Sequence, residues 1–319
     1  MLITLCIATC QRSEGLTALL QSLQHLQFSK SERPDLCVVV ADNDPQASAR
    51  QLCATLAASL PYRLIYVSEP QQGIPLARNA AFAAVPPATD FIALLDDDEI
   101  VSPVWLDEML AVQKDTGGEC IYGPILSVLP DDAPDWIRAG RFYDRPRHAN
   151  ASRITHAGSN NALVSWPFLQ ETGVRFDPAL RFSGGSDYLF FQQATAAGLR
   201  IFWADGAEVS EDIPPSRLSA DWIIRRQYRY GNTIALCERK TGGNLALRFL
   251  KGVARIIRGS LKILPALLQG KAARVAACAD AARGVGMLAG LLGKAYEEYR
   301  PDRVTADRAA TGSAADHPT

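Results

Sequence analysis

The sequence predicts an α/β fold with a mainly parallel central sheet flanked by helices. In the first hundred residues, short apolar and β-branched runs alternate with segments of helical periodicity, which is the pattern of βαβ units. Polar residues follow each apolar run, as expected where the strands of an open sheet end beside a ligand. The 319 residues, 48% of them hydrophobic, suffice for about two structural units with a sizeable core.

Four strands are expected in this part of the chain, over residues 2–8, 36–41, 64–67 and 91–95. Leucines at helical spacing after the first run predict a helix that packs one face on the sheet, with Ser13 as its candidate N-cap. Pro75 and the alanines that follow it predict another helix, which the pair Pro86-Pro87 would end.

Four consecutive carboxylates, Asp96 to Glu99, follow the fourth predicted strand. Adjacent carboxylates raise the cost of ionising one another unless a cation or hydrogen-bond donors compensate. Oxygen ligands on a short loop suit a hard ion such as Mg²⁺ or Mn²⁺, which keeps positions open for water and substrate phosphates. The plainer interpretation is a solvated acidic helix start, where negative charge is favourable. The position at the end of a strand favours a metal-diphosphate site.

The net charge of -1 conceals a contrast between an acidic body and a basic C-terminal region. Residues 245–300 contain ten basic and three acidic residues. Five basic residues share one face of a predicted amphipathic helix: Arg248, Lys251, Arg255, Arg258 and Lys262. Such a helix can lie in a membrane interface, or its apolar face can pack on the protein or on a second subunit. Glycines thin out a second tail helix and permit close packing on an unidentified partner.

Several classes of protein are excluded by what the sequence lacks. It contains no G-x-S-x-G elbow, no G-x-x-x-x-G-K-[ST] phosphate loop and no H-E-x-x-H pair. The seven cysteines are scattered without a C-x-x-C pair, which argues against a zinc ribbon and favours a reducing cytosol. No nucleic-acid partner is expected, because the basic stripe lacks interleaved aromatics and the body is acidic.

Seven segments together resemble family 2 glycosyltransferases with the GT-A fold, in this order and at this spacing. They are ITLCIATCQR, VVVADND, QQGIPLARNAA, LLDDDEIVSPVWL, GSNNALV, RFDPALRFSGGSDYLFF and RQYRYG. The resemblance covers roughly residues 2–235, and its motifs are specific as a set and weak singly. Further features resemble the succinoglycan-biosynthesis glucosyltransferase subgroup: LLDDDEIVSPVWL, Gly123-Pro124, the Glu-x-x-Pro at Glu211, Arg217 and Trp222-x-x-Arg225-Arg226.

The resemblance implies a division of the chain into four parts. Residues 1–115 would form the nucleotide-sugar-binding half of a GT-A domain, and residues 116–240 the half that carries the acceptor site and the catalytic base. Residues 241–300 would form the amphipathic, membrane-associating helices. The composition of residues 301–319 predicts a disordered tail.

The resemblance also implies roles for individual residues. Asp96 and Asp98 would form the D-x-D pair that binds Mg²⁺ or Mn²⁺, with Asp98 as the direct metal ligand and Asp96 nearer the ribose and the metal waters. Asp97 between them need not touch the ligand. Asp187 would be the catalytic base, although an Asp before aromatic residues is otherwise typical of a helix N-cap. The other implied donor- or acceptor-binding residues are Thr9 and Arg12 at the nucleobase, Asp42 at the base or ribose, Arg78 near the base and diphosphate, and Arg226 and Arg229 facing phosphate or acceptor.

The chain departs from the family pattern at two positions. Ser186 stands where relatives usually have Glu, before the candidate base. Glu211 lies where relatives often have a metal-binding His, and it could serve a metal or phosphate network or simply occupy a surface turn. The arginines Arg226 and Arg229 could likewise be solvated residues of a basic amphipathic helix.

The function that the resemblance implies is inverting, metal-dependent glycosyl transfer. The donor would be a nucleotide-sugar, by expectation a UDP-hexose, and the acceptor a lipid-linked saccharide in polysaccharide biosynthesis. The enzyme would be peripheral, at the cytoplasmic face of the inner membrane. The alternative is a catalytically inactive GT-A-like protein that binds nucleotide-sugar or lipid in an assembly, against which the retained carboxylates argue. A sugar nucleotidylyltransferase should open with a Gly-rich phosphate loop, and none occurs near Thr9.

Overall fold

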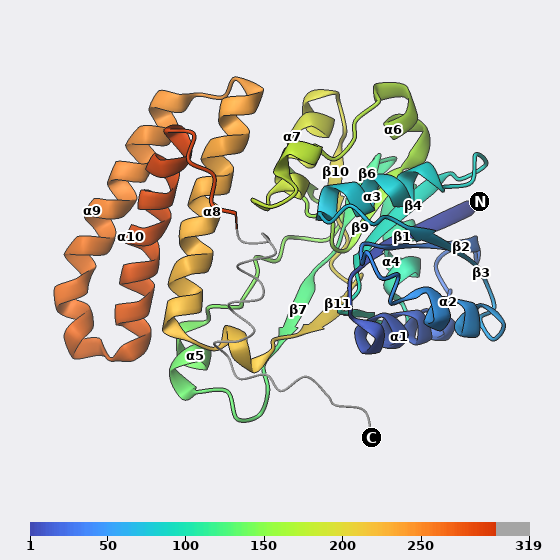
Figure 1. Ribbon diagram of the computed structural model, residues 1–319, viewed down its shortest axis with the longest axis horizontal. Coiled ribbons are helices and arrows are strands. Elements are labelled where there is room, and N and C mark those ends of the chain that lie inside the picture. Colours follow the sequence, from blue (N-terminus) through green and yellow to red (C-terminus); the bar gives the residue numbers. More distant parts are fainter. Residues whose placement is uncertain (298–319) are drawn as a thin grey trace. The chain divides into compact units, whose positions relative to one another are not determined.

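The computed structural model describes residues 1–297, and the chain divides into two compact units (Figure 1). Unit 1 comprises Met1–Leu129, Tyr143–Pro178 and Ser186–Asp212. Unit 2 comprises Pro130–Phe142, Ala179–Gly185 and, within the described residues, 213–297. The tail predicted over residues 301–319 lies outside the described residues, and the four-part division drawn from the sequence stays a prediction.

An eight-stranded sheet in the order β3-β2-β1-β4-β9-β6-β10-β8 forms the centre of unit 1. Its members are β1 (Leu2–Thr9), β2 (Asp35–Asp42), β3 (Arg63–Ser68), β4 (Phe91–Asp96), β6 (Cys120–Tyr122), β8 (Arg153–Ile154), β9 (Ala162–Ser165) and β10 (Ile201–Trp203). The first four pair in parallel, as do β6 and β10, whereas β9 and β8 are antiparallel to their neighbours. The predicted mainly parallel sheet is confirmed.

A second sheet of three strands runs in the order β5-β11-β7, with bounds β5 (Glu99–Val101), β11 (Val209–Asp212) and β7 (Ile125–Val128). In this sheet Glu99 lies opposite Glu211. The carboxylate run therefore connects two strands, because β4 ends at Asp96 and β5 begins at Glu99. The solvated helix start considered for these residues is wrong, since the next helix begins only at Trp105.

Helices cover both faces of the large sheet. Successive side chains of a strand point to opposite faces, so strands that are apolar throughout need a hydrophobic cover on each side. Along β1, Leu5 and Ile7 join one core cluster and Cys6 joins the other. The helices of unit 1 are α1 (Ser13–Ser22), α2 (Arg50–Ala57), α3 (Ile74–Ala83), α4 (Trp105–Thr116), α6 (Trp166–Thr172) and α7 (Ser186–Ala196). Ser13 is the first residue of α1 and not its N-cap, which is Arg12. Short 3₁₀ turns are η1 (Leu23–His25), η2 (Pro178–Leu180) and η3 (Pro215–Arg217).

Unit 2 is helical, with α5 (Asp135–Gly140), α8 (Ala220–Thr241), α9 (Leu245–Gln269) and α10 (Lys271–Leu291). α10 packs against both α8 and α9 (Figure 1). Glycines permit the close approach, since a Cβ on Gly286 would lie 2.0 Å from the carbonyl oxygen of Tyr228, and one on Gly284 would lie 2.5 Å from that of Gly252. The glycines noted in the sequence therefore pack α10 on its two neighbouring helices. None of the helices within residues 1–297 is long and apolar enough to cross a membrane.

Candidate active site at the carboxyl end of the sheet

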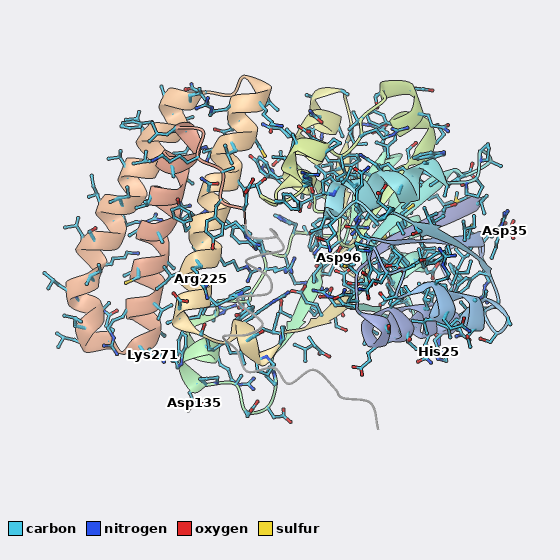
Figure 2. All side chains as sticks on the ribbon, viewed as in Figure 1. His25, Asp35, Asp96, Asp135, Arg225 and Lys271 are labelled. Carbon is cyan, nitrogen blue, oxygen red and sulfur yellow. The ribbon has the colours of Figure 1, made fainter. Side chains whose placement is uncertain are left out.

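The carboxyl ends of β2, β1 and β4 bring predicted donor-binding residues to one edge of the large sheet. β1 lies between its two neighbours, with Thr9 opposite Asp42 and Ala8 opposite Asp96. Because these strands are parallel, the loops that follow them meet at the same edge. Asp96 lies there within a dense group of side chains (Figure 2).

Asp97 anchors the loop after β1 to the turn after β4. The Thr9 hydroxyl donates to Asp97 Oδ2 at 2.8 Å, and Arg12 Nη1 donates to Asp97 Oδ1 at 3.0 Å and to Asp98 Oδ2 at 2.8 Å. Burial raises the pKa of Asp97, and Arg12 and the Thr9 hydrogen bond oppose that rise. Asp97 is thus a structural residue, which agrees with the expectation that it need not touch the ligand. Nucleobase binding by Thr9 and Arg12 stays a prediction.

Arg78 is a buried cation beneath this turn. Its Nη1 donates to the backbone oxygens of Cys6 and Leu95 at 2.9 Å each, and its Nη2 pairs with Asp96 Oδ1. The guanidinium thereby joins β1, β4 and the first carboxylate of the D-x-D pair. Its predicted approach to the base and diphosphate is untested. The contacts present in the structure are those of a residue that positions Asp96.

The D-x-D carboxylates remain partly open. The side chains of Asp96 and Asp98 are 44% and 33% exposed. Although Asp96 reaches solvent, the surrounding protein desolvates it and raises its pKa to about 6; Arg78 opposes the shift, and Asp98, Asp97 and Asp187 add to it. Each carboxylate has one oxygen, Asp96 Oδ2 or Asp98 Oδ1, that accepts no hydrogen bond from residues 1–297.

This pair fits the oxygen chemistry of a hard divalent cation. In the described part of the chain there is no group of three or more His, Cys, Asp or Glu side chains that could hold a metal ion. A cation here would accordingly take a few carboxylate oxygens from the protein and its remaining ligands from water and substrate phosphates, which is the usual arrangement for Mg²⁺. The histidines within residues 1–297, His25, His148 and His156, belong to no such group.

Asp187 lies in the first turn of α7, where its Oδ1 accepts from the backbone N–H of Tyr188 at 2.8 Å. Its charge contributes to the raised pKa of Asp96 and of Tyr122, so Asp187 is close enough to both for their charges to interact. Asp187 is one residue inside the helix and is not its N-cap, and Ser186 beside it is buried.

Asp42 is fully buried at the end of β2. Its Oδ1 accepts from the backbone N–H of Asp44 at 3.1 Å, and its Oδ2 accepts from the N–H of Ala49 at 2.8 Å and the hydroxyl of Tyr66 at 2.9 Å. Both oxygens therefore hold the loop that follows β2. The predicted contact of Asp42 with the base or ribose stays a prediction.

Two further carboxylates lie behind the D-x-D turn. Glu99 is fully buried; its Oε2 accepts from the backbone N–H of Asp96 at 2.8 Å, and its Oε1 has no partner among residues 1–297. Burial, followed by the charge of Asp96, raises its pKa well above the usual value. Glu211 Oε1 accepts from Arg145 Nη2 at 2.6 Å and from Ser127 Oγ at 2.9 Å. Glu211 thus lies in a strand and bears an ion pair, so the surface-turn interpretation is wrong.

Tyr122, at the end of β6, was not among the predicted site residues. Burial raises the pKa of its phenol, Arg145 opposes this, and Glu99, Asp187 and Asp96 add to it. The charges of these carboxylates therefore act on Tyr122, whose phenol can donate a hydrogen bond. The Gly123-Pro124 motif directly after it was the signal in the sequence, although a motif does not reveal where the preceding side chain lies.

Arg226 and Arg229 lie on α8 in unit 2. Arg226 Nε donates to the hydroxyl of Tyr230 at 2.8 Å, and its guanidinium lies 5.1 Å from the centroid of the Trp222 ring. The guanidinium of Arg229 lies 5.7 Å from the centroid of the Tyr230 ring. These cation-π contacts hold the arginines partly buried against aromatic rings. Their contact with phosphate or acceptor stays a prediction.

Comparison with known proteins shows the family. The sequence model of glycosyl transferase family 2 matches residues 4–171. Over 301 residues the chain is 33% identical to the succinoglycan biosynthesis protein ExoM of Rhizobium meliloti (strain 1021), a match that covers 94% of this chain and 96% of ExoM. The chain belongs to glycosyltransferase family 2. The resemblance to the succinoglycan-biosynthesis subgroup is also confirmed.

Solved structures confirm the GT-A fold of this family 2 member. S. aureus TarS matches with a TM-score of 0.52 and 18% identity over 74% of this chain, which spans 43% of that TarS chain. A shorter TarS structure, residues 1–349 in complex with UDP-GlcNAc, matches with a TM-score of 0.55 and 13% identity over 93% of both chains. At these identities the likeness concerns the fold alone.

Proposed function

We propose that this family 2 member is an inverting, metal-dependent enzyme that transfers a hexose from a UDP-sugar to a lipid-linked saccharide in polysaccharide biosynthesis. The observation that carries the proposal is the pair of partly open carboxylates, Asp96 and Asp98, where β4 ends at the carboxyl edge of the parallel sheet. The charge of Asp187, which acts on Asp96, supports it. Two likenesses support it: ExoM is named a succinoglycan biosynthesis protein, and TarS was solved with UDP-GlcNAc.

Donor binding depends on carboxylates that are positioned before the substrate arrives. Arg78 holds Asp96, and Arg12 holds Asp98 together with its buried neighbour Asp97. Mg²⁺ or Mn²⁺ held by Asp96 and Asp98, when bound, supplies positive charge that stabilises the leaving nucleoside diphosphate. Because the protein contacts are already formed in the unliganded chain, little reorganisation accompanies the reaction.

Asp187 accepts the proton of the acceptor hydroxyl. The hydroxyl oxygen attacks the anomeric carbon as the bond from that carbon to the diphosphate oxygen breaks, and the proton passes to the Asp187 carboxylate. A single displacement inverts the anomeric configuration.

The acceptor and its location complete the proposal. A lipid-linked saccharide is presented at a membrane, and we place the enzyme as a peripheral protein at the cytoplasmic face of the inner membrane. The basic helices of unit 2 support this placement, since cationic side chains are attracted to anionic leaflets. Arg226 and Arg229, held against aromatic rings, are proposed to contact phosphate or acceptor groups.

The test is release of nucleoside diphosphate that requires both acceptor and divalent cation. The purified chain is incubated with Mn²⁺, a lipid-linked saccharide and a panel of nucleotide sugars. Asp187→Asn is expected to lower kcat about 1000-fold with little change in donor affinity, because it removes the base and keeps the shape. Asp98→Asn is expected to lose donor affinity and cation dependence together.

The matched control is Asp115→Asn, which makes the same change at an exposed site on α4 and should leave turnover unaltered. Full activity of both Asp98→Asn and Asp187→Asn would overturn the assignment of metal ligand and base. UDP binding in a calorimeter, with no turnover from any donor in the panel, would instead support the inactive binding protein.

A further inference from the structure

α9 exposes a row of aliphatic side chains along its length. We call this set the aliphatic row: Leu250, Ile257, Leu261, Leu264 and Leu268. Their exposed fractions lie between 54% and 94%, and the largest belongs to Leu268 at the end of the helix. The row follows one face, because its members recur every three, four or seven residues.

The opposite face of α9 explains why these large side chains are outside. Gly252, Gly259 and Ala266 are the buried residues of the helix. A Cβ on Gly259 would lie 2.6 Å from the backbone nitrogen of Ala281, so α10 packs directly on this small-residue face. A surface helix whose outer face meets only water has the reverse arrangement, with its large apolar residues facing the protein core and polar residues facing the solvent. The aliphatic row is therefore arranged for contact with another apolar phase.

The cations of α9 fall into two groups. Arg248 pairs with Glu238, and Arg255 and Arg258 both pair with Asp280 on α10. Lys251 and Lys262 are exposed and directly follow Leu250 and Leu261 in the sequence, so they flank the aliphatic row on one side. The predicted basic stripe thus includes three arginines with internal partners, and the prominent exposed face is aliphatic.

Two further basic residues at the start of α10 lie toward α8 and α5, where they line a pocket with Ile224 of α8. Lys271 and Arg274, at the start of α10, are exposed, and Lys271 lies where α10 follows α9 (Figure 2). Its Nζ is 4.5 Å from the centroid of the Trp136 ring on α5. Within Leu245–Leu291 there are eight basic residues and a single acidic residue, Asp280, which already pairs with two arginines. The exposed charge on α9 itself is therefore uniformly positive.

We propose that α9 lies in the plane of an anionic phospholipid leaflet, with the aliphatic row among the acyl chains. Lys251 and Lys262, which flank the row, contact lipid phosphates. A second copy is a poorer partner for this face, because two such helices side by side would bring their lysines together with no acidic residue on α9 to pair them. An anionic leaflet supplies both the apolar phase and the opposite charge.

This inference rests on the proposed function only for the membrane setting, and its test does not use transfer. The full chain is floated with vesicles of phosphatidylcholine alone or with about one-third phosphatidylglycerol. Binding is expected to be at least about tenfold stronger to the anionic vesicles and to weaken with salt. The combined variant Leu261→Gln, Leu264→Gln, Leu268→Gln is expected to bind at least about tenfold more weakly than the parent.

Two comparisons make the result specific. The matched control replaces three exposed apolar residues of unit 1, Val104→Gln, Leu126→Gln and Val128→Gln, and should float like the parent. Lys251→Gln combined with Lys262→Gln should weaken binding only to the anionic vesicles, by roughly tenfold or more. Circular dichroism confirms that each variant is folded, as expected for exposed positions.

Three results would overturn the inference. They are unchanged flotation of the triple leucine variant, equal binding of the parent to neutral and anionic vesicles, and a lipid-free dimer in light scattering that the triple leucine variant abolishes. The last would assign the aliphatic row to a second copy of the chain. Turnover without vesicle binding contradicts only this inference, and vesicle binding without turnover contradicts only the proposed function.

Discussion

The two units depart from ordinary burial in opposite directions. In unit 1, charged side chains are buried at the end of the sheet, where Arg78 and Glu99 are almost inaccessible to solvent. In unit 2, aliphatic side chains are exposed, and most of Leu264 and Leu268 reaches solvent. Charged residues are rarely fully buried without a partner, and single exposed leucines are common, but an ordered row of them is not.

The difference shows how each unit leaves part of its chemistry for something outside the chain. In unit 1 most buried charged atoms have partners, and Arg78 Nε and Glu99 Oε1 are the exceptions among its described residues. The oxygens left open toward solvent are one on each of Asp96 and Asp98. In unit 2 glycines occupy the faces on which the helices pack together, and the exposed face of α9 is aliphatic. The first pattern suits a small hydrated cation with a charged substrate, and the second suits a lipid phase.

The strongest challenge to the account of unit 1 is Arg78→Met. The substitution keeps the length of the side chain and removes the cation that joins two strand carbonyls to Asp96. Breaking a buried pair leaves its partners desolvated, so the free energy of unfolding should fall by about 3 kcal/mol. Urea unfolding followed by circular dichroism measures the change.

Arg63→Met is the control for that experiment, since Arg63 is exposed on β3. It should change the free energy of unfolding by no more than about 0.5 kcal/mol. If Arg78→Met changes the free energy of unfolding as little as Arg63→Met does, the contacts of Arg78 with the strand carbonyls and Asp96 do not stabilise the fold. The predicted contact with the diphosphate would then deserve the greater weight.

The sequence predicts well which residues meet at the carboxyl edge of the sheet in unit 1, because the positions where the strands end determine this. Four apolar, β-branched runs and the polar residues after them were sufficient to predict that Thr9, Asp42 and the carboxylates lie at one edge of the sheet. The parallel pairing of the strands places them there. The roles within that edge depend on partners remote in the chain. Nothing local in LARNAA shows that Arg78 reaches the carbonyls of Cys6 and Leu95.

Unit 2 was harder to predict for a related reason. Helical periodicity divides α9 into faces, but it does not say which face is inside. The basic residues of α9 suggested the exposed surface, whereas Gly252 and Gly259 mark the face on which α10 packs. The acidic partner Asp280 lies on another helix, so the pairing of Arg255 and Arg258 is invisible to the periodicity of α9 alone.

The account of unit 2 is tested by Gly286→Ala. Replacing a helical glycine by alanine usually stabilises a helix by about 1 kcal/mol. Here the new Cβ would lie 2.0 Å from the carbonyl oxygen of Tyr228, and the helices would have to separate. We expect a net loss of about 2 kcal/mol, together with faster amide exchange in α8 and α10.

Gly252→Ala is the matched substitution in α9, because its Cβ would meet the mobile end of Leu288 at 3.1 Å. That contact can relax, so this variant should be close to neutral. Thermal unfolding and hydrogen exchange of the two variants decide the point. If the Gly286→Ala and Gly252→Ala variants are equally stable, the close approach of α8 and α10 is not what determines which side chains of unit 2 are exposed.

The smallest expected effect concerns Glu99, the buried carboxyl behind the D-x-D turn. Its pKa is raised in the folded chain, so its contribution to stability is complete below the unfolded pKa and is lost as the pH rises through the folded pKa. Glu99→Gln stays neutral throughout. The stability of the variant relative to the parent should therefore increase from about pH 5 to about pH 8.5, by roughly 1 kcal/mol with chelator present.

Thermal unfolding at the two pH values measures this difference, and Glu14→Gln in the exposed first turn of α1 should show the same small change at both. Mn²⁺ sharpens the comparison, because a cation at Asp96 and Asp98 favours the ionised form of Glu99 by direct attraction. The difference in stability between the Glu99→Gln variant and the parent should then become smaller at the higher pH. If Mn²⁺ leaves this difference unchanged, the buried carboxyl does not sense the cation, and the open oxygens of unit 1 are not where it binds.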